Sequence, residues 1–197
     1  MKTVQLKKVA NKKFKYLSEE LILKEPLVLV FGNRFMLQEK NIFNEVRELF
    51  KDGHIVFGST SGDITSEYVD EECITITAIE FEESSFSIKT SNVLNTSVQI
   101  DSYQTGKELI EQLPQEGLKY AFIVSDGSFT NGSQLTKGMN AATKDNLLIT
   151  GALCGDAVRF ETTWSRLPTT FLATASPSWI IPNPIPTCPK ISIPKSY

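Results

Sequence analysis

The stretch YAFIVSDGSFTNGSQLTKGMNAATKDNLLITGALCGD, residues 120–156, decides the fold class of this chain. Residues 120–124 form a short apolar run rich in strand-forming side chains. The run stops at Ser-Asp-Gly, residues 125–127, where Asp and Gly favour a turn. A first strand followed by a polar turn is therefore predicted here.

A helix and a second strand are predicted to follow that turn. Leu135, Met139 and Ala142 have helical spacing, and Asn131 is placed to cap the start of the helix. A second apolar run at 147–150 ends in a Gly-rich loop at 151–156. Strand, loop, helix, strand and loop in this order predict an α/β unit whose loops gather at one edge of a sheet.

A similar unit is predicted earlier in the chain. Residues 27–31 form a continuous apolar run, which is typical of a strand covered on both faces. An amphipathic helix from about Ile42 and a strand at 54–57 follow it, so the two strands are expected to be parallel neighbours. The remaining elements are predicted as a helix from about Tyr103 and as strands at 73–79, 86–90 and 97–100.

The predicted fold is a single α/β domain with a mixed, largely buried β-sheet and flanking helices. We divide the chain into a basic N-terminal segment at 1–26, a domain at 27–164 and a Pro-rich tail at 165–197. Seven of the nine prolines fall in that tail, which has no acidic residue. We interpret it as an irregular segment, either disordered or polyproline-like, or as the product of a frameshift.

Composition excludes several classes of protein. The 197 residues, 41% of them hydrophobic, suit one domain with a substantial core, and the net charge of −3 argues against a nucleic-acid partner. No apolar run is long enough to predict a membrane span. Three cysteines, Cys73, Cys154 and Cys188, are odd in number and far apart, which argues against a disulfide framework or a zinc site. A cytoplasmic location is expected.

The first fifteen residues carry six lysines and no acidic residue. One interpretation is contact with an anionic membrane or nucleic acid. The other, which we favour, is a solvated first strand, because Val4, Leu6 and Val9 interleave with the lysines.

Catalytic chemistry is not predicted. The segment 58–62 resembles a nucleophile elbow, but its centre is Thr60, and the single histidine, His54, precedes every candidate serine. No phosphate-binding or dinucleotide-binding glycine pattern is present, and one histidine with scattered thiols is poor material for a metal site. We therefore predict a protein that is not an enzyme and carries no cofactor or metal.

Three loops rich in Gly, Asp and Ser remain, each after an apolar strand, at 58–63, 125–132 and 151–156. Their backbone N–H groups and short side chains suit a small polar ligand. The alternative is that they are simply turns in which glycine supplies the backbone conformation. The pattern alone leaves both interpretations open.

Three motifs in these loops resemble the FIST domain: FGSTSGDI at 57–64, FIVSDG at 122–127 and ITGALCGD at 149–156. In that family a G-[CS]-S-T-x-G-[ED]-I loop, a strand ending in x-D-G and a G-G-x-A-G-D loop recur in this order. The resemblance covers about residues 27–163 and matches the N-terminal half of the family's architecture. This chain has Ala152 in place of the second glycine of the third motif, and Cys154 before Gly155.

The resemblance implies a cytoplasmic sensory domain that binds a small ligand such as an amino acid and is coupled to a signalling output protein or, in eukaryotes, to F-box proteins. The ligand-binding residues it implies are Gly58, Ser59, Thr60, Ser61, Gly62, Asp63, Asp126, Gly127, Gly151, Gly155 and Asp156. Carboxylates there would hold an ammonium group, and loop N–H groups a carboxylate.

Two alternatives stay open. In the first, the chain is a truncated FIST remnant that acts as a protein-interaction module without its own ligand. In the second, it is a haem-binding gas sensor, which has been suggested for some relatives and would need His54 or a cysteine as axial ligand.

Overall fold

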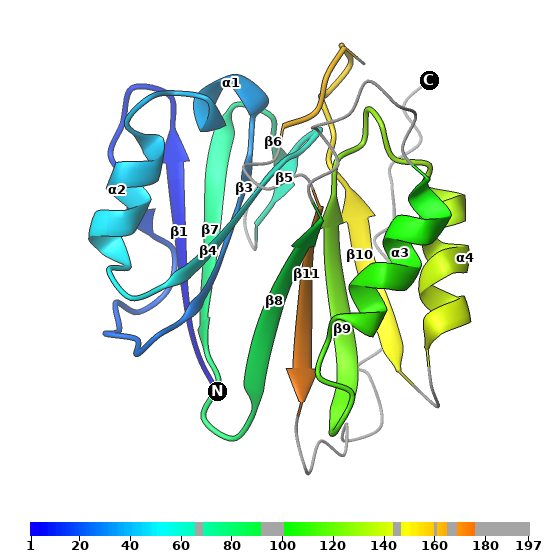
Figure 1. The fold of residues 1–197 in the computed structure, drawn as a ribbon. Coiled ribbons are helices and arrows are strands. Elements are labelled where there is room, and N and C mark those ends of the chain that lie inside the picture. The colour runs from blue at the N-terminus through cyan, green and yellow to red at the C-terminus, as the bar shows by residue number, and fades with distance from the viewer. Residues whose placement is uncertain (66–68, 92–100, 144–146, 160, 165–168, 176–197) are drawn as a thin grey trace, which may run out of the picture.

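The computed structural model describes residues 1–65, 69–91, 101–143, 147–159, 161–164 and, for the backbone alone, 169–175. Figure 1 shows two packed β-sheets with helices on their outer faces. The expected strand at 97–100 lies outside the described residues, as do 165–168 and 176–197 of the expected tail.

The first sheet has five strands in the order β2-β1-β7-β3-β4. Their bounds are β1 Lys2–Val9, β2 Lys15–Tyr16, β3 Leu27–Gly32, β4 His54–Ser59 and β7 Cys73–Glu80. Strands β3 and β4 are parallel, as predicted from the helix between them, and the other neighbours are antiparallel.

The second sheet has four strands in the order β10-β9-β11-β8, with β9 and β10 parallel. Their bounds are β8 Ser85–Ser91, β9 Leu118–Ser125, β10 Leu148–Leu153 and β11 Thr169–Ala175. A short antiparallel pair, β5 Asp63–Ile64 and β6 Val69–Asp70, stands apart from both sheets.

Four helices are α1 Arg34–Leu37, α2 Ile42–Leu49, α3 Ser102–Glu111 and α4 Gly132–Ala142. The three longer ones begin where the apolar spacing predicts them. Asp101 and Asn131 cap α3 and α4 through side-chain oxygens that accept from backbone N–H groups. The short α1 has no apolar periodicity long enough to predict it.

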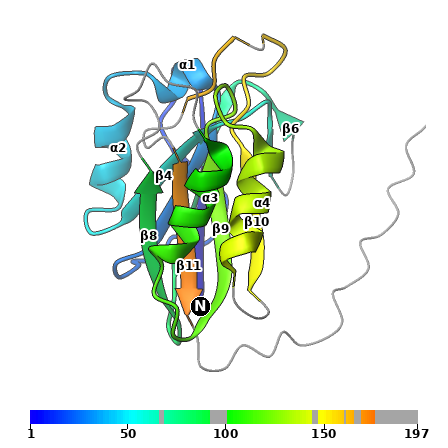
Figure 2. The ribbon, with the colours of Figure 1, turned by 45° about the vertical axis from the view of Figure 1, so that its right-hand side comes forward.

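Alternation along the central strands divides the core into three parts. On β3, Val28 and Val30 join a cluster with Val46 of α2, whereas Leu27 belongs to a cluster between the sheets that includes Val124 of β9. The next residue back along β9, Ile123, joins a third cluster beneath α3 and α4. The layers are therefore helix, sheet, sheet and helices, with α3 and α4 side by side in Figure 2. Each apolar run predicted as a covered strand has packing on both faces.

The mixed α/β class with flanking helices is confirmed, and the strands divide between two sheets. At the N-terminus, β1 pairs with β7 over its whole length, from Lys2 to Val9. All three of its lysines form ion pairs, Lys2 with Glu80 at 3.0 Å, Lys7 with Asp70 at 3.0 Å and Lys8 with Glu45 at 2.6 Å. The first residues thus form a strand of the sheet, in line with the favoured interpretation of the lysines.

Within the expected Pro-rich tail, residues Thr169–Ala175 form strand β11, which lies between β9 and β8. From the sequence we expect the whole tail to be irregular, because proline removes the backbone N–H that a central strand needs, but that reason does not apply to this segment. Pro168 and Pro177 lie on either side of it, so none of the seven residues lacks a backbone N–H. The predicted division of the chain at residues 26 and 164 stays a prediction.

Candidate functional site

The three loops singled out by sequence lie at the carboxyl ends of β4, β9 and β10. Parallel pairing of β9 with β10 places Ser125 beside Leu153 at the ends of these two strands. Strand β4 reaches the same place from the other sheet, because Gly155 donates its backbone N–H to Ser59 O at 2.8 Å. We call this meeting point, residues 58–63, 125–132 and 151–156, the loop junction.

Ser59, the last residue of β4, links the first sheet to Gly155 and Trp164 by hydrogen bonds. Its Oγ donates to Gly155 O at 2.7 Å and accepts from Trp164 N at 2.8 Å. Its backbone N–H donates to Trp164 O at 2.8 Å. Because Ser59 is only 2% exposed, these bonds are shielded from water and hold the two sheet edges together.

Asp126 organises the turn that follows β9. One carboxylate oxygen accepts from Ser128 N at 2.9 Å and Phe129 N at 2.8 Å, and the other accepts from Thr163 Oγ1 at 2.7 Å. This is an Asx-type turn with its second oxygen bound to a distant segment. Both carboxylate oxygens of Asp126 therefore accept hydrogen bonds from within the fold.

Asp63 is likewise turned inward. Its carboxylate accepts from Thr60 Oγ1 at 2.8 Å, from Thr75 Oγ1 at 3.2 Å and from the Cys73 thiol at 3.6 Å. Burial raises the pKa of Asp63 above its usual value, and these hydrogen bonds oppose part of that shift. Burial also raises the pKa of the Cys73 thiol to about 12.

Asp156 lies between two arginines. Its Oδ1 is 3.0 Å from Arg34 Nε and 3.1 Å from Arg159 Nε, and its Oδ2 accepts from the backbone amides of Glu161 and Thr162 at 3.2 Å. Burial alone would raise the pKa of Asp156, but these hydrogen bonds and charges outweigh it and lower the pKa below its usual value. The side chain is an ionised anchor for the loop after β10.

Two glycines of the loop junction occupy positions where another residue would not fit or would be strained. A Cβ on Gly155 would lie 2.9 Å from Ser61 N, so only glycine fits between these two loops. Gly151 has φ +143°, a conformation that other residues rarely adopt, and it lies within β10 opposite Ile123. Gly151 therefore serves the close pairing of β10 with β9.

Two adjoining cavities open at the loop junction and share Ser61, Leu153, Cys154 and Gly155. The inner cavity, about 270 Å³, reaches between the sheets. The inner cavity's further lining residues are Phe31, Ser59, Thr60, Phe122, Val124 and Ala152. The outer cavity, about 360 Å³, is lined on its remaining sides by Gly127, Ser128, Asp156, Ala157, Glu161, Thr162 and Thr163. The walls of the inner cavity are mainly apolar and those of the outer cavity are more polar, and such a pair of spaces suits a small amphiphilic ligand.

The predicted site residues divide into two groups. Six of them line the cavities: Ser59, Thr60, Ser61, Gly127, Gly155 and Asp156. The others, which do not line either cavity, are Gly58, Gly62, Asp63, Asp126 and Gly151. Gly58 and Gly151 lie within strands β4 and β10, and the carboxylates of Asp63 and Asp126 accept hydrogen bonds from within the fold.

Several lining residues escaped the sequence analysis. Phe31 and Phe122 come from apolar runs that predicted strands but gave no indication of a cavity. Thr163 contacts the turn at Gly127 through a hydrogen bond of 2.9 Å from the backbone N–H of that glycine. It lies at the far end of the resembling region, outside the three motifs. Cys154 lines both cavities, and burial raises the pKa of its thiol to about 12.

Within the part of the chain that the structure describes, no group of three or more His, Cys, Asp or Glu residues is arranged so that it could hold a metal ion. Over the same described ranges, no helix has both the length and the apolar character to cross a membrane.

The sequence of this chain matches one known protein family. The model of the FIST N domain matches residues 26–183, which includes all three loops and strand β11. The chain therefore belongs to the FIST family, whose members are sensory, non-catalytic domains of signal transduction. No protein with a curated description matches the chain.

Proposed function

We propose that this chain is a non-catalytic sensory module that binds a small polar metabolite of amino-acid type at the loop junction and passes its occupancy to a signalling output protein. The observation that carries the proposal is the convergence of loops from both sheets on a mainly apolar cavity that adjoins a second cavity with more polar walls. A ligand there would contact both halves of the fold, which is the arrangement a sensor needs. A cytoplasmic location is part of the proposal and rests on the family.

The ligand's apolar side chain would occupy the inner cavity against Phe31 and Phe122. Its carboxylate would be held in the outer cavity by hydroxyl and backbone N–H donors. One such donor is the hydroxyl of Ser61, which forms no hydrogen bond with a described residue. Since Asp63 and Asp126 are occupied internally, the ammonium group would use Glu161, whose side chain is 67% exposed and 3.2 Å from Arg34 Nη2.

Thermal unfolding with a panel of amino acids tests the proposal. A ligand at about 100 times its Kd adds about 2.7 kcal/mol to the free energy of unfolding and raises the Tm by several degrees. Ser61→Phe, at an exposed position that lines both cavities, should abolish the shift. Ser133→Phe, at an exposed position of α4, is the matched control and should keep it. No shift with any member of the panel, or an equal shift in Ser61→Phe, would contradict the proposal.

A protein-interaction module is the second candidate, and strand β10 favours it. Within the described strands β10 forms an edge of its sheet, and its Leu148 and Leu153 are 51% and 42% exposed. Open edges with exposed apolar side chains pair with other chains. Self-association in size-exclusion chromatography that Leu148→Lys removes would support this role, whereas a clean monomer would argue against it.

A further inference from the structure

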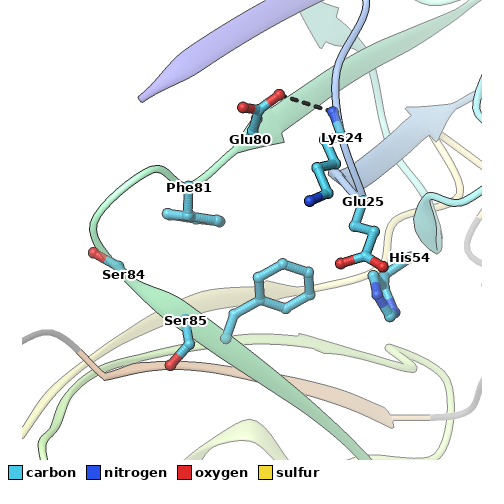
Figure 3. A pocket seen from close by; sticks show the side chains of 8 residues that line it. Lys24, Glu25, His54, Glu80, Phe81, Ser84 and Ser85 are labelled. Carbon is cyan, nitrogen blue, oxygen red and sulfur yellow. Dashed lines mark hydrogen bonds between the residues drawn. The ribbon is translucent and has the colours of Figure 1, made fainter.

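A third cavity, about 370 Å³, lies at the opposite ends of the strands from the loop junction. Its lining residues are Lys24, Glu25, His54, Glu80, Phe81, Ser84, Ser85 and Phe86. His54 begins β4, the strand whose other end is Ser59, so the length of a six-residue strand separates the two regions. On one side the wall is the segment before β3, and on the other it is the turn between β7 and β8 (Figure 3).

The aromatic part of the wall is built into the protein. The rings of Phe81 and Phe86 pack at 5.6 Å, and both side chains belong to the cluster between the sheets. The His54 ring meets Phe86 edge-on at 5.1 Å. Because these rings are fixed by the core, they offer a preformed apolar surface to a ligand.

The segment 24–25 is held in place from both directions. The backbone N–H of Lys24 donates to Glu80 Oε2 at 2.8 Å, and Pro26 O accepts from His54 N at 2.8 Å. Between them Glu25 has φ 43°, a conformation that is uncommon for a residue other than glycine. Pro26 follows Glu25, and a residue before proline is restricted further in its backbone conformation. The fold thus stabilises a strained backbone that presents two consecutive side chains to the cavity.

The charges of these two side chains are unpaired. Glu80 is neutralised by Lys2 Nζ at 3.0 Å, whereas the Lys24 amine and the Glu25 carboxylate form no hydrogen bond or ion pair with any described residue. Figure 3 shows the Lys24 amine and the Glu25 carboxylate both projecting into the cavity, with Phe81 on the opposite wall. One free cation, one free anion and an aromatic surface converge on one space.

We propose that this cavity is a second ligand site, distinct from the loop junction, that binds a small zwitterion with an aromatic body. The ligand's anionic group pairs with Lys24, its cationic group pairs with Glu25, and its ring lies against Phe81 and Phe86. A ligand with a single charge would leave one of the two protein charges unpaired. The site therefore selects for both charges together with an aromatic ring.

Calorimetric titration with L-phenylalanine tests the site, with 3-phenylpropionate, phenethylamine and glycine as probes that lack the cation, the anion and the ring. Phenylalanine should bind at least about tenfold more tightly than each of them. Each lost charge removes a charge-assisted hydrogen bond, and glycine loses the contact of the ring with Phe81 and Phe86. Lys24→Gln and Glu25→Gln should each weaken phenylalanine binding at least about tenfold. Lys12→Gln and Glu48→Gln change exposed charges elsewhere and should leave it unchanged.

The variant Ser61→Phe separates this site from the loop junction. Phenylalanine binding that survives Ser61→Phe and is lost in Lys24→Gln and Glu25→Gln supports the second site. Binding that is lost in Ser61→Phe and survives at residues 24 and 25 overturns it, and leaves the function proposed for the loop junction intact. Equal affinity for 3-phenylpropionate and phenylalanine would overturn the assignment to a zwitterion.

Discussion

The carboxylate of Asp63 points into the fold, and ionisation of this carboxylate lowers the free energy of unfolding. Burial raises the pKa of Asp63 above the ordinary 3.8, so its contribution to stability is present below that value and is lost as the pH rises through the higher folded pKa. We predict that wild type loses stability relative to Asp63→Asn as the pH rises above 3.8. Urea unfolding from pH 3.5 to 7 measures it, with the exposed Asp52→Asn as control. A difference between wild type and Asp63→Asn that does not change with pH would refute the prediction.

Gly127 lies where a side chain has no room. A Cβ there would collide with the carbonyl oxygen of Cys154 and lie 3.1 Å from Thr163 Cγ2. We predict that Gly127→Ala lowers the free energy of unfolding by about 2 kcal/mol or more, because backbone must move. At Gly132 the nearest atom is the flexible end of Leu153 at 3.3 Å, so Gly132→Ala should cost far less in the same denaturant titration. Equal losses would show that the clash does not decide the effect.

The residues of the loop junction could be found from sequence, but most of their roles could not. Asp followed by Gly is equally typical of a turn and of a ligand contact, and the distinction depends on donors that lie far along the chain. Asp126 is bound by Thr163, and Asp156 by Arg34. Neither partner stands out in the sequence. The apolar walls at Phe31 and Phe122 were hidden because a cavity leaves the strand pattern unchanged.

The first turn of helix α4 is capped by the side chain of Asn131, a residue of the loop junction. Asn131 accepts from Gln134 N at 3.1 Å, whereas Asn41, at the start of α2, makes no such bond. We predict that Asn131→Ala lowers the free energy of unfolding by about 1 kcal/mol and that Asn41→Ala has little effect. Chemical denaturation of both variants measures the difference. A loss at Asn41 as large as that at Asn131 would contradict the role of the side-chain bond.

The positions of the longer helices follow from local periodicity, which is why α2, α3 and α4 begin near the predicted residues. Strand pairing is a long-range property, and the sequence does not show which sheet a strand joins. The continuous apolar run at β3 required cover on both faces, and the structure supplies a helix on one side and the second sheet on the other. Strand β11 was missed because the surrounding prolines dominated the composition of its region.

The two sheets are joined at the loop junction by a small number of buried hydrogen bonds. Ser59 Oγ links Gly155 O to Trp164 N; Ser59 is buried, and Gly155 and Trp164 are partly buried. We predict that Ser59→Ala lowers the free energy of unfolding by about 1 to 3 kcal/mol, because a buried donor and a buried acceptor lose their partner. Ser133→Ala on the exposed face of α4 should stay within about 0.5 kcal/mol of wild type in the same assay. A Ser59→Ala variant as stable as wild type would show that the loops are joined by other contacts.

The function that we propose requires that a ligand at the loop junction alters how the two sheets meet. The inner cavity draws its walls from β4 on one sheet and from β9 and β10 on the other, and Ser61, just beyond β4, lines both cavities, so a ligand there would contact both sheets. Under the proposed function, binding of a small molecule would therefore change the relation between the two halves of the fold, which an output protein could recognise.

The central claim is that a small metabolite binds at the loop junction, and amide NMR of the full chain tests it most directly. The titrant is the amino acid that gives the largest thermal shift. We predict that the amides of Ser61, Gly127, Ser128 and Gly155 shift together and saturate with one affinity, while those of α2 stay in place. Saturable binding that leaves these four amides unmoved would contradict the account.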